Sequence, residues 1–473
     1  MADAGHSAGH GAPATIDFSA NRYKTIFRLA LPTVFAMLLQ SAVNEVDDIF
    51  FGHLPCPEGG VCEASNAQGA LLPSLLIVWL FGGSLGAISV GTQAYTARRI
   101  AEGKKLDAGA VLANAVWFTL IGGVVFTILA RLLMPALLGV MVSVEPVRKV
   151  AIEYSQWRLL GVLSMAITMA IKGFFDGIGK TQLHFVASLV MNVANVIMCW
   201  AFIFGHMGAP RMGAPGAGLA GFLSTWIGLF IMVGYAWAHR KEYDPIRWSA
   251  LSKGLTWDML KLSVPAALAT IVMMLGFGLF TRIVGSLDAP GSEPVAGAST
   301  TNIIEILKLT FTACIAFGTA TATLVSQSLG AKRPADAERY AWSSVRLGLA
   351  LFGVVGALEG FILRRPMLSL FSTSAAVRDA MEVPMMMMGF VTPVIAVALI
   401  LSEALFGAGN SRFVAAAQFL LVFGVLVPLA WLLGVKMGMG VMGIWTSGAV
   451  YAALASVVMA LKFRAGGWKK IVI

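Results

Sequence analysis

Phe175-Asp-Gly-Ile-Gly-Lys-Thr181 and Phe406-Gly-Ala-Gly-Asn-Ser411 are two versions of one motif, about 230 residues apart in the chain. Three more pairs of motifs recur in the same order and with a similar separation. These pairs are Leu29-Ala-Leu-Pro32 with Leu262-Ser-Val-Pro265, Phe51-Gly52 with Val284-Gly285, and Val90-Gly-Thr-Gln93 with Leu324-Val-Ser-Gln327. Ordered recurrence of this kind indicates an internal duplication. We therefore expect two similar halves, an arrangement that lets one half rock against the other in many membrane transporters.

The composition is that of a membrane protein. Apolar residues make up 58% of the chain and charged residues only 12%, whereas a soluble domain has about 25% charged residues. A helix needs about 20 apolar residues to cross the hydrocarbon core of a bilayer, and the sequence contains twelve such runs. The first six cover residues 26–51, 70–92, 111–134, 154–175, 185–204 and 217–238, and the second six cover 262–284, 303–324, 345–363, 385–405, 413–435 and 441–461. We therefore predict an all-α polytopic membrane protein with twelve transmembrane helices in two pseudo-two-fold-related halves.

The charge pattern predicts the orientation and the domains. The formal net charge of +10 would suit a nucleic-acid partner, but Lys and Arg concentrate in alternate loops, and residues 52–69 contain neither. This bias places both termini in the cytoplasm and argues against nucleic-acid binding, although Arg364, Arg365 and Arg378 lie on the outer side. The expected domains are a disordered cytoplasmic tail (1–20), an N-lobe (21–239), a polar cytoplasmic linker (240–253) and a C-lobe (254–473).

The four cysteines fall into two groups. Cys199 and Cys314 lie inside predicted spans and are expected to be inert core thiols. Cys56 and Cys62 lie in the first outer loop, where an oxidising compartment would allow a disulfide bond between them. Two free thiols are the alternative, and the sequence alone leaves both possibilities open.

The first predicted span carries the acids Glu45, Asp47 and Asp48. A charge at mid-membrane costs about 2.5–3.5 kcal/mol on insertion scales, so intramembrane acids are the default functional candidates. Gln40, Asn44 and Asp47 follow one another at helical spacing and share one helix face. The alternative is that all three acids sit in the outer interface. Asp47 is the strongest candidate because it continues the stripe of Gln40 and Asn44.

Polar residues also mark the fifth, eighth and tenth predicted spans. Asn192 and Asn195 share one face of the fifth span, where they could join helices or supply oxygen atoms to a cation or a protonated carboxyl. The eighth span has the longest polar stripe, which comprises Glu305, Lys308, Thr312, Thr319, Thr323 and Ser326. Glu305 and Lys308 could form a structural ion pair, but the threonines favour a wetted cavity. Glu403, near the inner end of the tenth span, is expected to be interfacial.

Motifs of known enzymes are not found at a plausible site in the sequence: no P-loop, HExxH or GxSxG occurs there. We therefore expect neither enzymatic activity, nor a cofactor, nor a metal site. A membrane-embedded enzyme would need a nucleophile–base pair or a metal cluster, but His184 and His206 are isolated and lie near span ends.

Five motifs together resemble the multidrug and toxic compound extrusion (MATE) family. They are Pro32…Asp47-Asp-Ile-Phe-Phe-Gly52, Gly177-Ile-Gly-Lys-Thr181, Asn195…Ile203-Phe-Gly205, Gly213-Ala-Pro-Gly-Ala-Gly-Leu-Ala220 and Leu324-Val-Ser-Gln-Ser-Leu-Gly-Ala-Lys332. Each motif is weak alone, but the ordered set covers nearly the whole chain beyond the tail. The resemblance implies two six-helix lobes around a central V-shaped cavity, and export of organic cations and other drugs against entry of protons or sodium.

The resemblance also implies functional residues. The coupling acid of bacterial and archaeal members falls on Asp47, and an asparagine of the same site falls on Asn195. A cavity glutamine of archaeal relatives matches Gln40. The span-eight acid of eukaryotic members matches Glu305. These matches favour proton coupling, with Asp47 central and Glu305 second.

Four positions depart from the family pattern. Cys199 and Gly221 stand where relatives often have Asp and Thr, which argues against hard-cation binding in the N-lobe. The span-seven Glu of other members aligns with Met273, and the span-ten Asp aligns near Ile395. Proton coupling is therefore favoured over sodium coupling.

We expect a secondary active multidrug efflux antiporter that exchanges organic cations and other amphipathic compounds for inward protons, with sodium less favoured. The coupling-ion candidates are Asp47, Asn195 and Glu305, and the substrate-binding candidates are Gln40, Asn44, Asn192, Thr312, Thr319 and Met273. The expected partners are small-molecule substrates, H⁺ or Na⁺ and membrane lipids, and the expected form is a monomer in the inner membrane. The alternatives are a lipid-linked oligosaccharide flippase of the same superfamily, which should have a larger basic cavity for pyrophosphate, and a non-transporting membrane receptor or scaffold.

Overall fold

The computed structural model describes residues 21–54, 63–142, 145–244, 251–288, 295–371 and 374–471. These residues form helices, and no strand occurs among them. Eleven of the helical segments that they form are long and apolar enough to cross a bilayer. Helix α1 (Arg22–Gly52), with 31 residues, is a further helix of sufficient length. The predicted all-α membrane fold with twelve spans is therefore confirmed. Cys56 and Cys62 lie outside the described residues.

The first half of the chain supplies six spans. After α1, the second span is a continuous rod made of α2 (Glu63–Val78), η1 (Trp79–Gly83), α3 (Ser84–Gly86) and α4 (Ile88–Ala101). The other four are α5 (Lys105–Met141), α6 (Glu145–Arg158) continued through η2 (Leu159–Gly161) into α7 (Val162–Gly177), α8 (Thr181–Phe204) and α9 (Ala214–Ala238). The short helix α10 (Arg240–Tyr243) follows them.

The second half repeats this plan. Its first four spans are α11 (Lys253–Gly285), α12 (Val295–Gly330), α13 (Pro334–Ala357) with η4 (Leu358–Ile362), and α15 (Ala375–Gly407). The last two are α18 (Gly440–Arg464) and, before it, the rod of α16 (Ser411–Leu421), η5 (Val422–Leu426), α17 (Val427–Leu429) and η6 (Ala430–Lys436). The short helices are α14 (Arg364–Phe371) and η7 (Gly467–Lys470). Most helices extend beyond the apolar runs, because hydropathy marks only the hydrocarbon core while the helix continues into the headgroup region.

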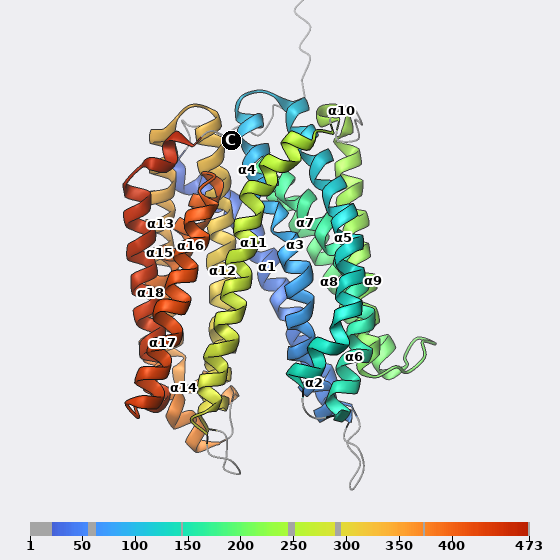
Figure 1. Cartoon of the computed structure of the whole chain (residues 1–473), viewed down its shortest axis with the longest axis vertical. Coiled ribbons are helices and arrows are strands. Elements are labelled where there is room, and N and C mark those ends of the chain that lie inside the picture. The colour runs from blue at the N-terminus through green and yellow to red at the C-terminus, as the bar shows by residue number, and fades with distance from the viewer. Residues whose placement is uncertain are drawn as a thin grey trace, which may run out of the picture.

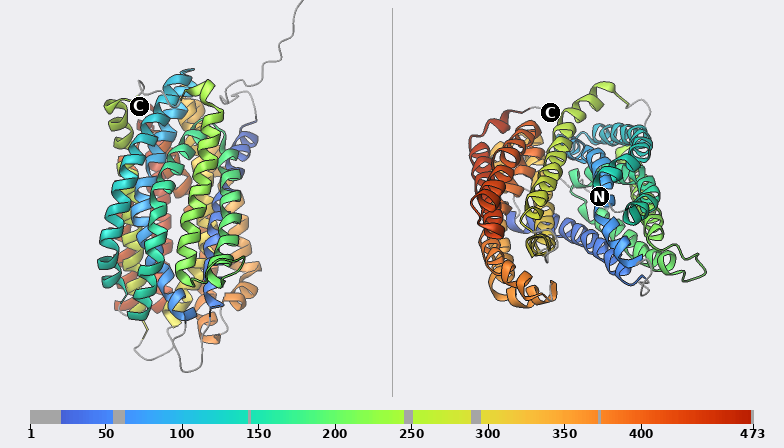
Figure 2. Two further views of the ribbon diagram at one scale, coloured as in Figure 1. Left: turned by 90° about the vertical axis from the view of Figure 1, so that its right-hand side faces the viewer. Right: turned by 60° about the horizontal axis from the view of Figure 1, so that its bottom comes forward.

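The two halves form two helix bundles. In Figure 1 the helices α2 to α9 gather on one side and the orange-to-red helices on the other, and the tilted view in Figure 2 separates them in the same way. Helix α1 begins against the C-lobe, where Ile26 and Ala30 are buried, and crosses to the N-lobe. The bundles lie close together at the end that carries the C-terminus, called the C-terminal side below, and diverge toward the opposite side (Figure 1). The prediction of two six-helix lobes arranged as a V is confirmed.

Side-chain hydrogen bonds join the lobes on the C-terminal side. Ser326 Oγ of α12 donates to the Ala94 carbonyl of α4 at 2.9 Å. Gln327 Nε2 donates to the Gly177 carbonyl at 2.6 Å, and Gln93 Nε2 donates to Thr323 Oγ1 at 2.7 Å. All six residues are buried. Polar groups removed from water need such partners, so these contacts stabilise closure of the lobes at this end.

These hydrogen bonds between the lobes, called the seal below, also show why the sequence motifs recur. Gln93 and Gln327 occupy equivalent places in the duplicated halves, and each donates a hydrogen bond to the other lobe. Gly179 and Gly409, also equivalent, follow α7 and α15 with φ angles of +79° and +87°. A left-handed residue at a helix end favours glycine. The repeated motif therefore encodes both a helix end and the contact between the lobes.

Candidate functional site

The acid singled out in the first span lies in a buried site of the N-lobe. Asp47, on α1, is only 5% exposed. Cys199 of α8 donates its thiol hydrogen to Asp47 Oδ1 at 3.2 Å, and the same sulfur lies 3.8 Å from Oδ1 of Asn195. Cys199 is therefore not the inert core thiol that the sequence suggested, because it is the hydrogen-bond partner of the membrane acid.

A chain of polar groups continues from this carboxyl into the neighbouring helices. Asn195 Nδ2 donates to Ser224 Oγ of α9 at 3.2 Å, and Ser224 Oγ donates to the Gly221 carbonyl at 3.0 Å. Asn195 and Ser224 are buried. The structure thus brings Asp47 and Asn195 together as predicted, and adds Ser224, which the sequence analysis missed.

Other buried polar atoms in the N-lobe have no hydrogen-bond partner among the described residues. They include both amide atoms of Asn192, Oη of Tyr154 and Nε of Arg158. An unsatisfied buried polar group costs about 1–3 kcal/mol, so a native protein retains such groups where they have a task. Asn192 lies one helical turn from Asn195 on α8, which makes its free amide available near the Asp47 site.

Arg158 brings a positive charge to this site. It is the last residue of α6 and lies one helical turn from Tyr154, whose ring packs edge to face on Phe51 of α1 at 6.2 Å between centroids. Phe51 is itself one turn from Asp47. The Arg158 guanidinium lies directly against Gly221 of α9, where an added Cβ would be 1.8 Å from Nη1. The sequence analysis missed Arg158, although a basic residue four positions inside the fourth predicted span was a signal that could have drawn attention to it.

The other α1 candidates are only partly described. Gln40 and Asn44 lie within α1, but their side chains fall outside the described residues, as do those of Glu45 and Asp48. The backbone therefore places them on the helix that carries Asp47 and says nothing of their contacts.

The C-lobe candidates are more dispersed. Glu305 forms an ion pair with Lys308, and both side chains are 35% exposed. Thr312 and Thr319 are half-buried on α12, and the Thr319 carbonyl accepts a hydrogen bond from Gln93 Nε2 at 3.0 Å. Sδ of Met273 lies 3.9 Å from Oη of Tyr451 within the same lobe. The structure does not bring these residues together with Asp47.

Two residues of the predicted α12 stripe serve another purpose. Thr323 was expected to line a wetted cavity and Ser326 belongs to the same polar stripe, but both are completely buried. Thr323 Oγ1 donates to the Asp176 carbonyl at 3.0 Å, and Ser326 bonds Ala94 across the lobes. The stripe was therefore interpreted wrongly at this end, because a polar helix face can seal an interface as well as line a cavity.

Residues 32–201 and 265–432 match the family model described as MatE. The chain belongs to this family, the MATE transporters. The two matched segments begin at Pro32 and Pro265, the equivalent prolines of the duplicated halves.

Relatives of this MATE chain include a probable multidrug resistance protein NorM of Thermotoga maritima. It is 24% identical over 457 residues, which cover 94% of this chain and 93% of that protein. Multidrug resistance protein PmpM of Pseudomonas aeruginosa is 25% identical over 358 residues, covering 75% of this chain and 72% of its own length.

Solved structures share the fold. One is described as the outward-facing conformation of a multidrug resistance MATE family transporter of the MOP superfamily, and it aligns with a TM-score of 0.84 at 20% identity, covering 94% of this chain and 96% of its own. Another is a MOP superfamily transporter from Pyrococcus furiosus, described as having a binding pocket of reverse polarity that suggests a different function. It aligns with a TM-score of 0.85 at 20% identity and covers 96% of this chain and 98% of its own.

The C-lobe of this MATE chain holds acids that the sequence analysis undervalued or missed. Glu403 of α15 is half-buried beside Gly318 of α12. The expectation that Glu403 is interfacial stays a prediction. Glu359 in η4 accepts a hydrogen bond from Thr310 Oγ1 at 2.5 Å. The sequence analysis missed this residue, although an acid inside the ninth predicted span could have drawn attention to it.

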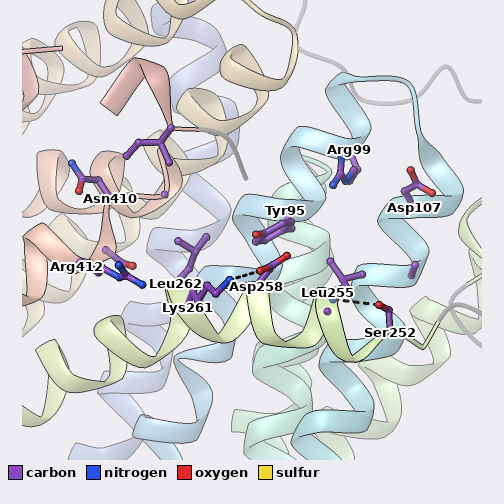
Figure 3. Close-up of a pocket in the computed structure, with 15 residues that line it drawn as sticks. Tyr95, Arg99, Asp107, Ser252, Leu255, Asp258, Lys261, Leu262, Asn410 and Arg412 are labelled. Carbon is purple, nitrogen blue, oxygen red and sulfur yellow. Dashed lines mark hydrogen bonds and ion pairs between the residues drawn. The ribbon is translucent and has the colours of Figure 1, made fainter. Parts of the chain in front are cut away.

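A separate cavity of about 880 Å³ lies on the C-terminal side. Figure 3 shows its charged lining, which comes from both halves of the chain and includes Arg99, Asp107, Asp258, Lys261 and Arg412. Lys261 Nζ and Asp258 Oδ1 form an ion pair of 2.8 Å within it. Asp47 and Asn195 are not among its lining residues, so this cavity is distinct from the N-lobe site.

Proposed function

We propose that this MATE chain is a secondary active multidrug efflux antiporter. It exports organic cations and other amphipathic compounds and takes up protons in exchange, with sodium less favoured. The single observation that carries the proposal is the buried carboxyl of Asp47, which lies on α1 in one lobe and is bonded to Cys199 beside Asn195. The printed names of the relatives, multidrug resistance proteins, support export of drugs.

The exchange follows from the charge of this carboxyl. An ionised Asp47 attracts a cationic substrate, whereas a proton bound to the same group removes that attraction. Protons that enter from outside therefore release the substrate, and the two cations compete for one group. The membrane potential adds about 2.3 kcal/mol per charge for each 100 mV, which is enough to bias lobe states that differ by a few kcal/mol.

Rocking of the two lobes would carry the site from one side of the membrane to the other. The seal of Gln93, Thr323, Ser326 and Gln327 on the C-terminal side supports a state closed toward that side. Because the basic loops favour a cytoplasmic location for both termini, we assign the C-terminal side to the cytoplasm of the inner membrane. The lobes then diverge toward the outside (Figure 1).

The remaining candidates take supporting roles in this proposal. Asn195 positions the Asp47 site, and Asn192 contributes its free amide to substrate binding together with Gln40 and Asn44 from α1. Thr312, Thr319 and Met273 are the C-lobe side of the substrate path. Glu305 stays a secondary coupling candidate, since its ion pair with Lys308 already accounts for its charge.

Transport in proteoliposomes tests the proposal. Purified protein is reconstituted with ethidium, an organic cation, and efflux is measured under an imposed proton gradient and, separately, under an imposed sodium gradient. We expect the proton gradient alone to drive ethidium movement, and an ionophore that collapses it to stop transport. If ethidium moves under neither gradient, the antiporter assignment is contradicted.

A further inference from the structure

Arg158 is held in the N-lobe site by close helix packing. Helices α6 and α9 meet at glycines: a Cβ at Gly218 would lie 2.4 Å from the Tyr154 carbonyl, and one at Gly221 would lie 1.8 Å from Nη1 and 2.6 Å from Cζ of Arg158. The guanidinium therefore occupies the space that a side chain at position 221 would take. Even alanine at this position would have to displace the arginine.

The guanidinium and the Asp47 carboxyl are electrostatic neighbours. The Phe51 ring of α1 and the Tyr154 ring of α6 meet edge to face with their centroids 6.2 Å apart. Asp47 lies one helical turn from Phe51 and Arg158 one turn from Tyr154, so the two charged residues belong to neighbouring turns of the packed helices. No direct ion pair between Arg158 and Asp47 occurs among the described contacts, and Nε of Arg158 has no hydrogen-bond partner there. The arginine thus brings a positive charge to the Asp47 site without forming an ion pair with the carboxyl among the described residues.

The donor atoms near Asp47 also disfavour a metal ion. Hard cations prefer oxygen ligands, but the atom in contact with Asp47 Oδ1 is the sulfur of Cys199. A second cation entering this site would meet both the sulfur and the fixed positive charge of Arg158.

We propose that Arg158 acts as a fixed cation that excludes sodium and other monovalent metal ions from the Asp47 site. Arg158 would thereby select the proton as the coupling ion, an inference that rests on the proposed function. A proton forms a covalent O–H bond with the carboxyl and needs no coordination sphere, so the guanidinium does not block it. A metal ion needs several oxygen ligands and is repelled by the resident charge. Arg158 is therefore a specificity-determining residue for the coupling ion.

Charge-neutral substitution of the arginine tests the proposal. Arg158→Gln should acquire sodium binding at least about tenfold tighter than the wild type, since one nearby positive charge has been removed. Binding is measured as the rise in melting temperature of the detergent-solubilised protein with increasing sodium chloride against choline chloride, a readout independent of transport. In proteoliposomes the same variant should show ethidium efflux driven by a sodium gradient.

The controls separate charge from structure. Arg158→Lys retains the charge and should remain indifferent to sodium, as should Arg148→Gln, which removes a charge about three turns away on α6. If Arg158→Gln is not recovered folded, Arg158→Met replaces it with another unbranched neutral side chain. Sodium-driven efflux by the wild type, or neutral variants that gain no sodium response, would overturn the proposal. Proton-driven efflux in the same vesicles would show that the proposed function stands even then.

Discussion

The thiol of Cys199 donates a hydrogen bond to the carboxyl of Asp47 across the interface of α8 and α1, at 3.2 Å. This contact ties the membrane acid of the N-lobe to a second helix and, through Asn195 and Ser224, to a third. Movement of α1 relative to α8 would therefore change the surroundings of Asp47. A change in its protonation would in turn alter the packing of the three helices.

Removal of the thiol should weaken this connection. In Cys199→Ala a buried carboxyl loses its described hydrogen-bond donor, so we expect a loss of about 1–2 kcal/mol in stability and slower efflux. Cys199→Ser supplies a hydroxyl donor at the same place and should retain most of the transport. Melting temperatures and ethidium efflux of the two variants check this. Equal activity of the alanine and serine variants would contradict the role of the hydrogen bond.

The repeated motif should tolerate little change at Gly407. A Cβ there would lie 2.4 Å from the Ala322 carbonyl, so α15 and α12 would have to separate. Gly407→Ala is expected to lose about 1–3 kcal/mol through overpacking. Gly353→Ala is the matched control, because a Cβ at Gly353 meets no atom within 4 Å. Thermal melting in detergent distinguishes the two, and a similar melting temperature for both would show that the glycine contact is dispensable.

The seal between the lobes should control the closed state. Gln93→Leu with Gln327→Leu removes hydrogen bonds worth about 0.5–1.5 kcal/mol each, so the state open on the C-terminal side should become roughly tenfold more populated. Spin labels at Lys104 and Arg339, whose side chains are 54% and 64% exposed in the two lobes, would report longer distances in the variant. The labels require replacement of Cys56 and Cys62. An unchanged distance distribution would exclude a gating role for the two glutamines.

Stability at the end of α4 should depend on pH through Glu102. Burial raises the pKa of Glu102, but hydrogen bonds and charges of Lys104 and Arg99 outweigh it and hold the pKa below its ordinary value of 4.5. A lowered pKa contributes stability at neutral pH that is lost as the pH falls below about 4.5. Glu102→Gln should therefore melt slightly lower at pH 7, by a few tenths of a kcal/mol, and match the wild type near pH 3. An equal difference at both pH values would contradict this origin.

The fold could be predicted largely from the sequence because its two determinants are local. Apolar runs of about 20 residues identify the spans, and the duplicated motifs identify the halves. Gly179 and Gly409 recur because both helix ends need a positive φ. Helix lengths were underestimated, since α12 begins at Val295, well before its apolar run.

The site was less predictable because a single sequence shows which face a residue occupies but not what packs against that face. Thr323 and Ser326 share a polar face with Thr319, yet they seal the lobes and line no cavity. Arg158 belongs to the Asp47 site only because Gly221, 63 positions later, leaves room for its guanidinium. Such pairings between distant helices depend on tertiary packing.

Replacement of the central acid tests the account most directly. Ethidium efflux driven by a proton gradient is compared in proteoliposomes between the wild type, Asp47→Asn and Asp336→Asn, the last of which removes a surface acid paired with Arg339. The account predicts that Asp47→Asn is folded and inserted but has no proton-driven efflux, while Asp336→Asn matches the wild type. Full proton-driven efflux by Asp47→Asn would contradict it.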